Sequence, residues 1–294
     1  MTESACFDVT AFMPLLRERI YTRNTFTRQF LISWLSVLHS VPHLDLLTFL
    51  PDILDGLFTI LEDPTMEIKK MCESLLGEFL RSIIENPKHV DYASMINILI
   101  HHSQSSDELL RVTFYFFFIF IIHILMFIII PLQYTAVTWI SEFAILSGPA
   151  ILPYTSGILT AILPCMAYDD DSKKGYIFEF LNQPQMGQQK LLYLDLRETT
   201  RIVNSNLMRL VDSDSEKNME LGSVVLVLDQ HLTHNSVHTK VAVLKWIEHL
   251  LSHLPNSVSA LFCIFIWYFL VWFYIRCFNK CRFYLIPRNY SRYC

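Results

Sequence analysis

Glycine is scarce in this chain, with seven in 294 residues, and the motifs that depend on glycine are missing. There is no G-x-G-x-x-G and no G-x-x-x-x-G-K-[ST], which excludes the folds that cradle phosphate groups on such loops. The G-x-S-x-G of a hydrolase nucleophile is missing too. The net charge of −5 gives no basis for a nucleic-acid-binding surface. We therefore expect no enzyme, no cofactor and no nucleic-acid partner.

Metal ligands at recognisable spacings are also lacking. Three histidines lie close together, His231, His234 and His238, and two more, His249 and His253, are spaced i, i+4. A zinc site would need a carboxylate or thiolate partner, or the H-E-x-x-H pattern on one helix face, and neither is present. These histidines are therefore expected to be solvated or to cap helices.

Acidic and thiol side chains give no stronger signal. Asp169–Asp171 is interpreted as a polar turn between helices, rather than as a carboxylate cluster for a metal. The seven cysteines are scattered, and Cys72 and Cys165 fall on apolar helix stripes. This pattern predicts buried, reduced thiols, as is usual in cytosolic proteins.

The sequence does contain a well-defined amphipathic helix pair from Leu46 to Ile84, hinged at Asp63-Pro64. Apolar residues recur at steps of three and four, which predicts one buried face on each helix. On the first helix they are Leu47, Leu50, Ile53, Leu54, Leu57, Phe58 and Leu61, and on the second Ile68, Met71, Cys72, Leu75, Leu76, Phe79, Leu80 and Ile83. The opposite face of the second helix, expected to lie in solvent, carries Glu67, Lys69, Lys70, Glu73, Glu78 and Arg81.

A unit of this kind, roughly 40 residues long, cannot bury its apolar face alone and has to stack on similar units. The expected fold is therefore all-α, a HEAT/armadillo-type α-solenoid. Helices are expected over Ala11–Ile20, Phe26–Val41, Leu46–Leu61, Met66–Ile84, Val90–His102, Tyr134–Leu146, Ile151–Cys165, Arg197–Val211, Val224–Leu232 and Val237–Leu254. In the last of them the predicted apolar face is Val237, Val241, Leu244, Ile247, Leu251 and Leu254.

Two runs, Val112–Leu132 and Val258–Ile275, are apolar all round. The first would be about 31 Å long as a helix, close to the ~30 Å hydrocarbon core of a bilayer. One interpretation is therefore a two-span integral membrane protein with a helical cytosolic domain. The other starts from the register: joining Leu110 to Tyr134 restores a single helix, with Val137 on its apolar face. The first run then looks like an insert into a helix that is complete without it.

Seven stretches resemble the Vac-fourteen family, also called the associated regulator of PIKfyve. They are FMPLLRERIY (12–21), RQFLISWLSVLHSVP (28–42), LPDILDGLFTIL (50–61), KKMCESLLGEFL (69–80), LPYTSGILTAILPCMAYDD (152–170), NSNLMRLV (204–211) and VAVLKWIEHL (241–250). They follow the order of the family, a HEAT-repeat scaffold of the complex that makes phosphatidylinositol 3,5-bisphosphate.

The resemblance predicts a division of the chain. HEAT repeats are expected at 1–110, 134–174 and 197–256, the last with an acidic linker at 212–220. Residues 111–133 are interpreted as an apolar insert from a retained intron or a gene-model error, 175–196 as an aperiodic insert, and 257–294 as an apolar tail outside the family pattern. The leading repeats and the C-terminal region of the family are expected to be missing.

The resemblance also implies a function, that of a non-enzymatic scaffold, here a fragment, which holds a PIKfyve-type lipid kinase and a partner phosphoinositide phosphatase together. In the family the kinase is expected on the HEAT region, and the phosphatase contact and self-association on the C-terminal part. The location implied is the cytosolic face of endosome, lysosome or vacuole membranes, with peripheral and indirect membrane contact. As a partner surface we predict the basic residues Arg17, Arg19, Lys69 and Lys70.

Overall fold

The computed structural model describes residues 8–41, 44–104, 120–169, 187–212, 215–234, 236–255 and 257–258. Every regular element within these ranges is a helix. The α-helices are α1 (Val9–Arg19), α2 (Thr25–Ser40), α3 (Leu50–Leu61), α4 (Met66–Glu85), α5 (Tyr92–Ser103), α7 (Phe120–Leu146), α8 (Thr155–Ile162), α10 (Gly187–Leu210), α11 (Leu221–Leu232) and α12 (Val237–His253). Short 3₁₀ turns join several of them, namely η1 (Leu47–Phe49), η2 (Pro87–His89), η3 (Gly148–Tyr154), η4 (Pro164–Asp169) and η6 (Ser215–Lys217).

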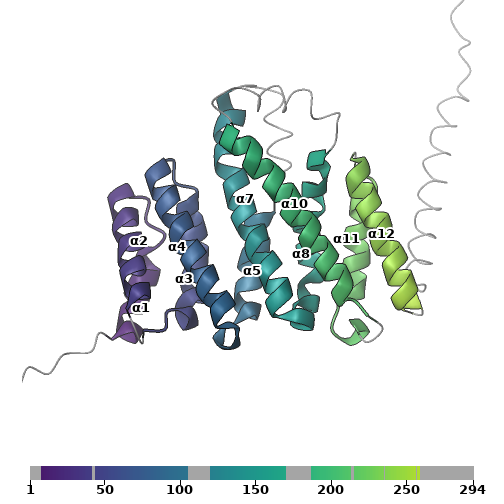
Figure 1. Cartoon of the computed structure of the whole chain (residues 1–294), viewed down its shortest axis with the longest axis horizontal. Coiled ribbons are helices and arrows are strands. Elements are labelled where there is room, and N and C mark those ends of the chain that lie inside the picture. Colours follow the sequence, from purple (N-terminus) through teal and green to yellow (C-terminus); the bar gives the residue numbers. More distant parts are fainter. Residues whose placement is uncertain are drawn as a thin grey trace, which may run out of the picture.

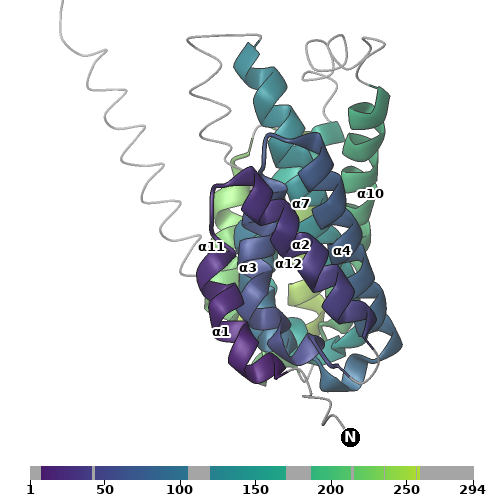
Figure 2. The ribbon, with the colours of Figure 1, turned by 90° about the vertical axis from the view of Figure 1, so that its left-hand side faces the viewer.

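The helices form an elongated stack of pairs in chain order, α1/α2, α3/α4, α5/α7, α8/α10 and α11/α12 (Figure 1). The stack has two layers, which the view along its length separates (Figure 2). Contacts along one layer join α1 with α3, α3 with α5, α5 with α8, and α8 with α11; along the other they join α2 with α4, α4 with α7, and α7 with α10. Each pair therefore packs mainly on its neighbours, which confirms the predicted all-α solenoid.

The helix pair α3/α4 folds as its apolar pattern predicts. All seven apolar residues predicted for the first helix are buried, and so are those of the second, apart from Met71 and Leu80, which are partly buried. Phe58 and Phe79 are completely enclosed. Since a fully buried side chain of this size contributes about 1.5–3 kcal/mol, the two stripes supply most of the driving force for stacking.

Two glycines allow close approach between helices of one layer. A Cβ on Gly56 of α3 would overlap the side chain of Ile20, at the end of α1. A Cβ on Gly157 of α8 would stand 3.0 Å from Cδ1 of Ile100 in α5. These positions therefore set the spacing of neighbouring pairs, whereas Gly77 of α4 has nothing within 4 Å of the corresponding point.

Three of the differences from the predicted helix boundaries are large. Ile151–Cys165 is not one helix: it divides into η3, α8 and η4, because Pro153 and Pro164 lack the amide hydrogen that an α-helix interior needs. Helix α10 begins at Gly187, so the last part of the segment predicted to be aperiodic is helical. Helix α7 begins at Phe120, inside the first apolar run, and continues through Pro131.

The predicted apolar face of α12 is wrong at four of its six positions, whereas Leu254 is buried and Ile247 partly buried, as predicted. Val237, Val241, Leu244 and Leu251 are exposed, and the buried face is instead Thr239, Ala242, Val243, Trp246 and Leu250. Both sets have helical spacing, and two directional contacts select the second. Nε1 of Trp246 donates a 2.7 Å hydrogen bond to Oδ1 of Asn204 in α10, and the Thr239 hydroxyl donates to the Leu163 carbonyl at 3.2 Å.

The two apolar runs are only partly visible. Within the described ranges no helix combines the length and hydropathy needed to cross a bilayer. Residues 112–119 and the second run beyond Val258 lie outside those ranges. In α7, Val137 is buried, as predicted from joining Leu110 to Tyr134, and Ile140 and Ala144 are buried beside it in the same helix.

Candidate partner-binding surfaces

A buried ion pair connects the first two helix pairs. Arg28 of α2 donates from Nη1 to Oδ2 of Asp63 at 2.7 Å, and from Nε to the Thr22 carbonyl at 2.7 Å. Asp63 lies in the turn between α3 and α4, where its Oδ1 accepts from the Thr65 amide at 2.8 Å. Burial alone would raise the pKa of Asp63, but the hydrogen bonds from Thr65 and Arg28 outweigh it and lower that pKa. The pair therefore stabilises the seam between neighbours as an ionised contact.

Lys69 of α4 was predicted to lie in solvent and is instead buried, with 3% of its surface exposed. Burial lowers the pKa of its ammonium group, partly offset by the nearby carboxylates of Glu73, Asp63 and Glu62. A long cation-bearing side chain fits here because these acidic groups surround it at the base of α4. Lys69 is thus part of the packing of this helix pair, and its assignment to an exposed face was wrong.

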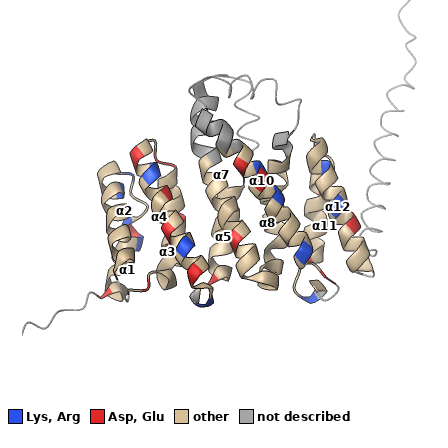
Figure 3. Cartoon of the chain, in the orientation of Figure 1, with Lys and Arg blue, Asp and Glu red and all other residues tan. Residues whose placement is uncertain are grey.

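The other three predicted residues do not form one surface. Arg17 and Arg19 are exposed on α1, and Nη1 of Arg17 is 3.2 Å from Oδ1 of Asp52 on α3. Lys70 is exposed on α4, and α1 and α4 lie on opposite sides of the stack, with α2 and α3 between them (Figure 2). Charges of both signs are interspersed along the stack rather than gathered on one face (Figure 3).

A second polar chain crosses three consecutive helix pairs. The Tyr21 hydroxyl donates to Oδ2 of Asp55 at 3.0 Å, and Nε2 of His102 lies 2.8 Å from Oδ1 of the same carboxylate. His102 also stacks on Phe58, with ring centroids 5.0 Å apart. Burial opposes ionisation of Asp55, but the bonds from His102 and Tyr21 lower its pKa overall. This contact joins the segment just after α1 to α3 and α5.

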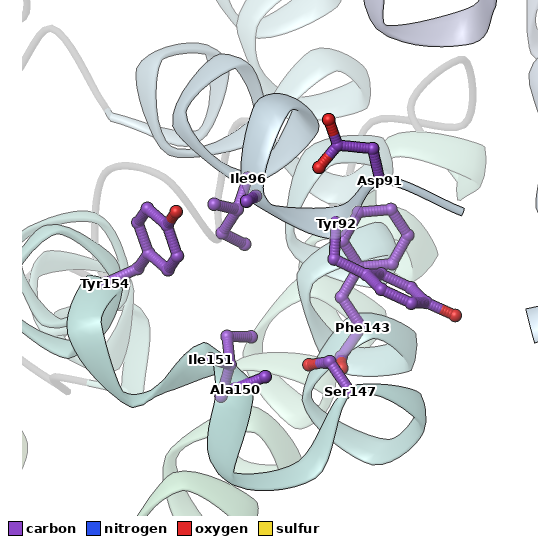
Figure 4. A pocket seen from close by; sticks show the side chains of 9 residues that line it. Asp91, Tyr92, Ile96, Phe143, Ser147, Ala150, Ile151 and Tyr154 are labelled. Carbon is purple, nitrogen blue, oxygen red and sulfur yellow. The ribbon is translucent and has the colours of Figure 1, made fainter. Parts of the chain in front are cut away.

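A small cavity of about 220 Å³ lies between α5, α7 and η3. Its walls come from Tyr92, Ile96, Phe143, Ile151 and Tyr154, with Ser147, Ala150, Ala93 and Asp91 also lining it (Figure 4). The Asp91 carboxylate already accepts from the amide and hydroxyl of Ser94, where it caps α5. The cavity is therefore lined mainly by apolar and aromatic side chains, and the Asp91 carboxylate at its edge is already hydrogen-bonded.

Metal and nucleophile chemistry find no support in the described part of the chain. No cluster of three or more histidine, cysteine, aspartate or glutamate side chains there could hold a metal. His249 instead lies 3.2 Å from the Val211 carbonyl, and Asp170 and Asp171 fall outside the described ranges. Cys72 and Cys165 are buried, as predicted, and burial raises the pKa of the Cys72 thiol far above its usual value.

The outward face of α2 was not predicted from the sequence. Phe26, Phe30, Trp34, Val37 and Val41 are all exposed there, and they follow one another at steps of three and four. Two signals could have identified this face: its helical spacing, and the lack of any charged residue on that side of the helix.

Taken together, stacked helix pairs, neighbour-only contacts and an extended exterior define a helical-repeat protein of the α-solenoid class. Comparison with known proteins then gives its family. The chain is 34% identical to Protein VAC14 homolog of Arabidopsis thaliana over 252 residues, 86% of the chain and 28% of that relative. It is 27% identical to Protein VAC14 homolog of Schizosaccharomyces pombe over 82% of the chain and 32% of that relative. The chain belongs to the Vac14 family.

A shorter match supports this assignment. Vacuole morphology and inheritance protein 14 of Saccharomyces cerevisiae is 42% identical over 77 residues, 26% of the chain and 9% of that relative. The chain thus spans about a third of the length of the first two relatives. No protein-family model and no solved structure matches it.

Proposed function

We propose that this chain is a non-enzymatic scaffold region that takes part in regulating a PIKfyve-type lipid kinase, in a complex with a partner phosphoinositide phosphatase. The observation that carries the proposal is the match to a Vac14 protein over 86% of a chain built of stacked helix pairs. In this proposal the complex of scaffold, kinase and phosphatase controls the synthesis and turnover of phosphatidylinositol 3,5-bisphosphate. The name of the yeast relative, a vacuole morphology and inheritance protein, supports an association with the vacuole. The location that we propose is the cytosolic face of endosome, lysosome or vacuole membranes.

The physical basis of such a role is effective concentration. A rigid stack that binds two enzymes turns their encounter into an intramolecular event, with local concentrations that reach the millimolar range for short connections. Neighbour-only packing keeps the exterior of the stack long and accessible to several partners. Membrane contact is then indirect, through the bound partners.

For the kinase contact we propose the exposed face of α4 around Lys70. Lys69 is buried beside Glu73 and Asp63, so it is unavailable to a partner. Arg19, exposed on α1, serves as a matched exposed cation on a helix other than α4.

The test is co-precipitation of the lipid kinase with the tagged full chain from cells of the same species. Lys70→Glu should reduce kinase recovery at least threefold, whereas Arg19→Glu should leave it unchanged. Lys69→Glu should lower recovery only together with the helical circular dichroism signal, because it disturbs packing. If the wild-type chain recovers no kinase, the scaffold proposal is wrong; if Lys70→Glu binds normally, only the assigned face is wrong.

A further inference from the structure

The cavity between α5, α7 and η3 is lined by aromatic rings and one carboxylate. Among the nine described residues that line it, Asp91 is the one that bears a charge at neutral pH, and none is lysine, arginine or histidine. Tyr154 lies on one side of the cavity, and Tyr92 and Phe143 lie on the other (Figure 4). Phe143 and Ile96 are completely or almost completely buried, so the floor is apolar. The lining is therefore complementary to a cation on an apolar stem.

The Asp91 carboxylate is exposed and can accept from a further partner. Hydrogen bonds from the hydroxyl and the amide of Ser94 hold the pKa of Asp91 below its usual range, so the group is ionised. Oδ1 accepts from the Ser94 amide at 3.2 Å and Oδ2 from the Ser94 hydroxyl, whereas a carboxylate offers about four acceptor positions. As the N-cap of α5, Asp91 also places a negative charge at the helix end where an anion would otherwise be favoured. The site therefore selects a cation.

The size of the cavity favours a single side chain over a free small molecule. Its volume of about 220 Å³ is below the range of about 300–1,000 Å³ that is usual for sites enclosing a whole ligand. One wall is fixed before binding: the Tyr92 hydroxyl donates to the Pro87 carbonyl at 3.2 Å, and its ring meets Phe143 edge to face, with centroids 4.8 Å apart. A side chain that enters therefore has little ordering cost to overcome in this chain.

We propose that this cavity binds an arginine side chain of a partner protein. The aliphatic stem of the arginine packs on Ile96 and Ile151. Its guanidinium group stacks on the ring of Tyr154 and donates two hydrogen bonds to the Asp91 carboxylate. A guanidinium is flat, forked and weakly hydrated, so it can use a ring and a carboxylate together. A lysine ammonium is more strongly hydrated and lacks the fork, and a quaternary ammonium has no N–H to donate to Asp91.

The experiment is a methyl NMR titration of the full chain, labelled with ¹³C at the isoleucine methyl groups, with the N-acetyl amide of arginine. Saturable shifts at Ile96 and Ile151 should give a dissociation constant of about 1–10 mM, as expected for the contact of one side chain. The N-acetyl amide of citrulline has the same shape but no charge, and it should bind at least tenfold more weakly. The N-acetyl amides of lysine and trimethyllysine should also bind more weakly than that of arginine.

Variants test the two assigned contacts. Asp91→Asn keeps the helix cap and should weaken arginine binding at least fivefold. Tyr154→Leu keeps the apolar bulk without the ring and should have a similar effect, whereas Tyr154→Phe should bind within twofold of the wild type. Glu248→Gln, at an exposed carboxylate of α12, is the matched control and should leave binding unchanged.

The proposal would be overturned by the absence of saturable shifts up to about 100 mM arginine amide, or by equal binding of citrulline. Tighter binding of the lysine or trimethyllysine amide would contradict the choice of arginine, and so would undiminished binding by Asp91→Asn. Shifts confined to other isoleucine methyl groups would show that arginine binds elsewhere. Because this titration involves no kinase and no residue of α4, its failure is distinguishable from failure of the proposed function.

Discussion

Nη1 of Arg28, in the first helix pair, donates a 2.7 Å hydrogen bond to Oδ2 of Asp63, in the turn of the second. Both side chains are almost completely enclosed, at 10% and 2% exposure. The contact therefore links two repeats at a point where neither partner can turn to water. Such a bond orients one pair on the next, in addition to the apolar seam that drives their association.

Removal of this guanidinium should weaken the stack. Arg28→Ala leaves the Asp63 carboxylate buried with only the hydrogen bonds from Thr65, so the free energy of unfolding should fall by about 2–4 kcal/mol. Urea unfolding followed by circular dichroism measures this change. Arg17→Ala is the matched control, because its partner Asp52 is half exposed, and it should cost less than about 1 kcal/mol. Equal losses for the two variants would show that burial does not distinguish these ion pairs.

The same ion pair predicts a dependence on pH. The pKa of Asp63 is lower in the folded protein than in the unfolded chain, so its contribution is complete above the unfolded value, about 4, and is lost as pH falls through the folded value. The difference in unfolding free energy between wild type and Arg28→Ala should thus be constant from about pH 7 to about pH 4 and shrink below it. A difference that widens in acid would be incompatible with an ionised Asp63 in the folded state.

Substitution by alanine should change the free energy of unfolding in opposite directions at two glycines, each in the middle of a helix. Gly77→Ala adds a methyl group to open space and removes backbone freedom from the unfolded chain, so it should stabilise by about 0.5–1 kcal/mol. Gly56→Ala forces its Cβ into Ile20 and should destabilise by about 1–3 kcal/mol. Thermal unfolding measures both changes: the unfolding temperature should rise for Gly77→Ala and fall for Gly56→Ala, relative to the wild type. A stabilising Gly56→Ala would mean that α1 and α3 are farther apart than described.

The first apolar run leads to a prediction at the level of the message. If residues 111–133 derive from a retained intron, sequenced transcripts should include one that joins the codon for Leu110 directly to a codon near Tyr134. The burial of Val137 and Ile140 on the helix that would result is consistent with this junction. A transcript population that always retains the run, together with carbonate-resistant membrane association of the protein, would contradict the intron interpretation.

The spacing of apolar residues predicts the buried face of a helix only where a single face is apolar. In α3 and α4 one face is apolar and the other charged, so spacing alone selects the buried face, and it does so correctly. In α12 two apolar faces compete, and the choice falls to Trp246, whose indole needs the Asn204 acceptor on another helix. Periodicity along one helix contains no information on such a tertiary partner.

The candidate site shows the same limit. Arg17, Arg19 and Lys70 are exposed, as their positions on polar faces suggest, but Lys69 is buried near the carboxylates of Glu73, Asp63 and Glu62. Pattern analysis counts a lysine as solvated because burying an unpaired cation is costly. The apolar spacing along α4 contains no information on the acidic turn before this helix, which makes the burial of Lys69 possible. Partner surfaces of a solenoid are therefore the part of the molecule that sequence patterns predict least well.

The most direct test of the stacked-pair architecture is hydrogen exchange, measured by mass spectrometry, on the wild type and Arg28→Ala. Because each pair contacts mainly its neighbours, loss of the Arg28–Asp63 bond should accelerate exchange in α1–α4 and leave α11 and α12 unchanged. Uniform acceleration through α12 would instead indicate one globular core that opens as a unit, and would contradict the solenoid on which the proposed scaffold function depends.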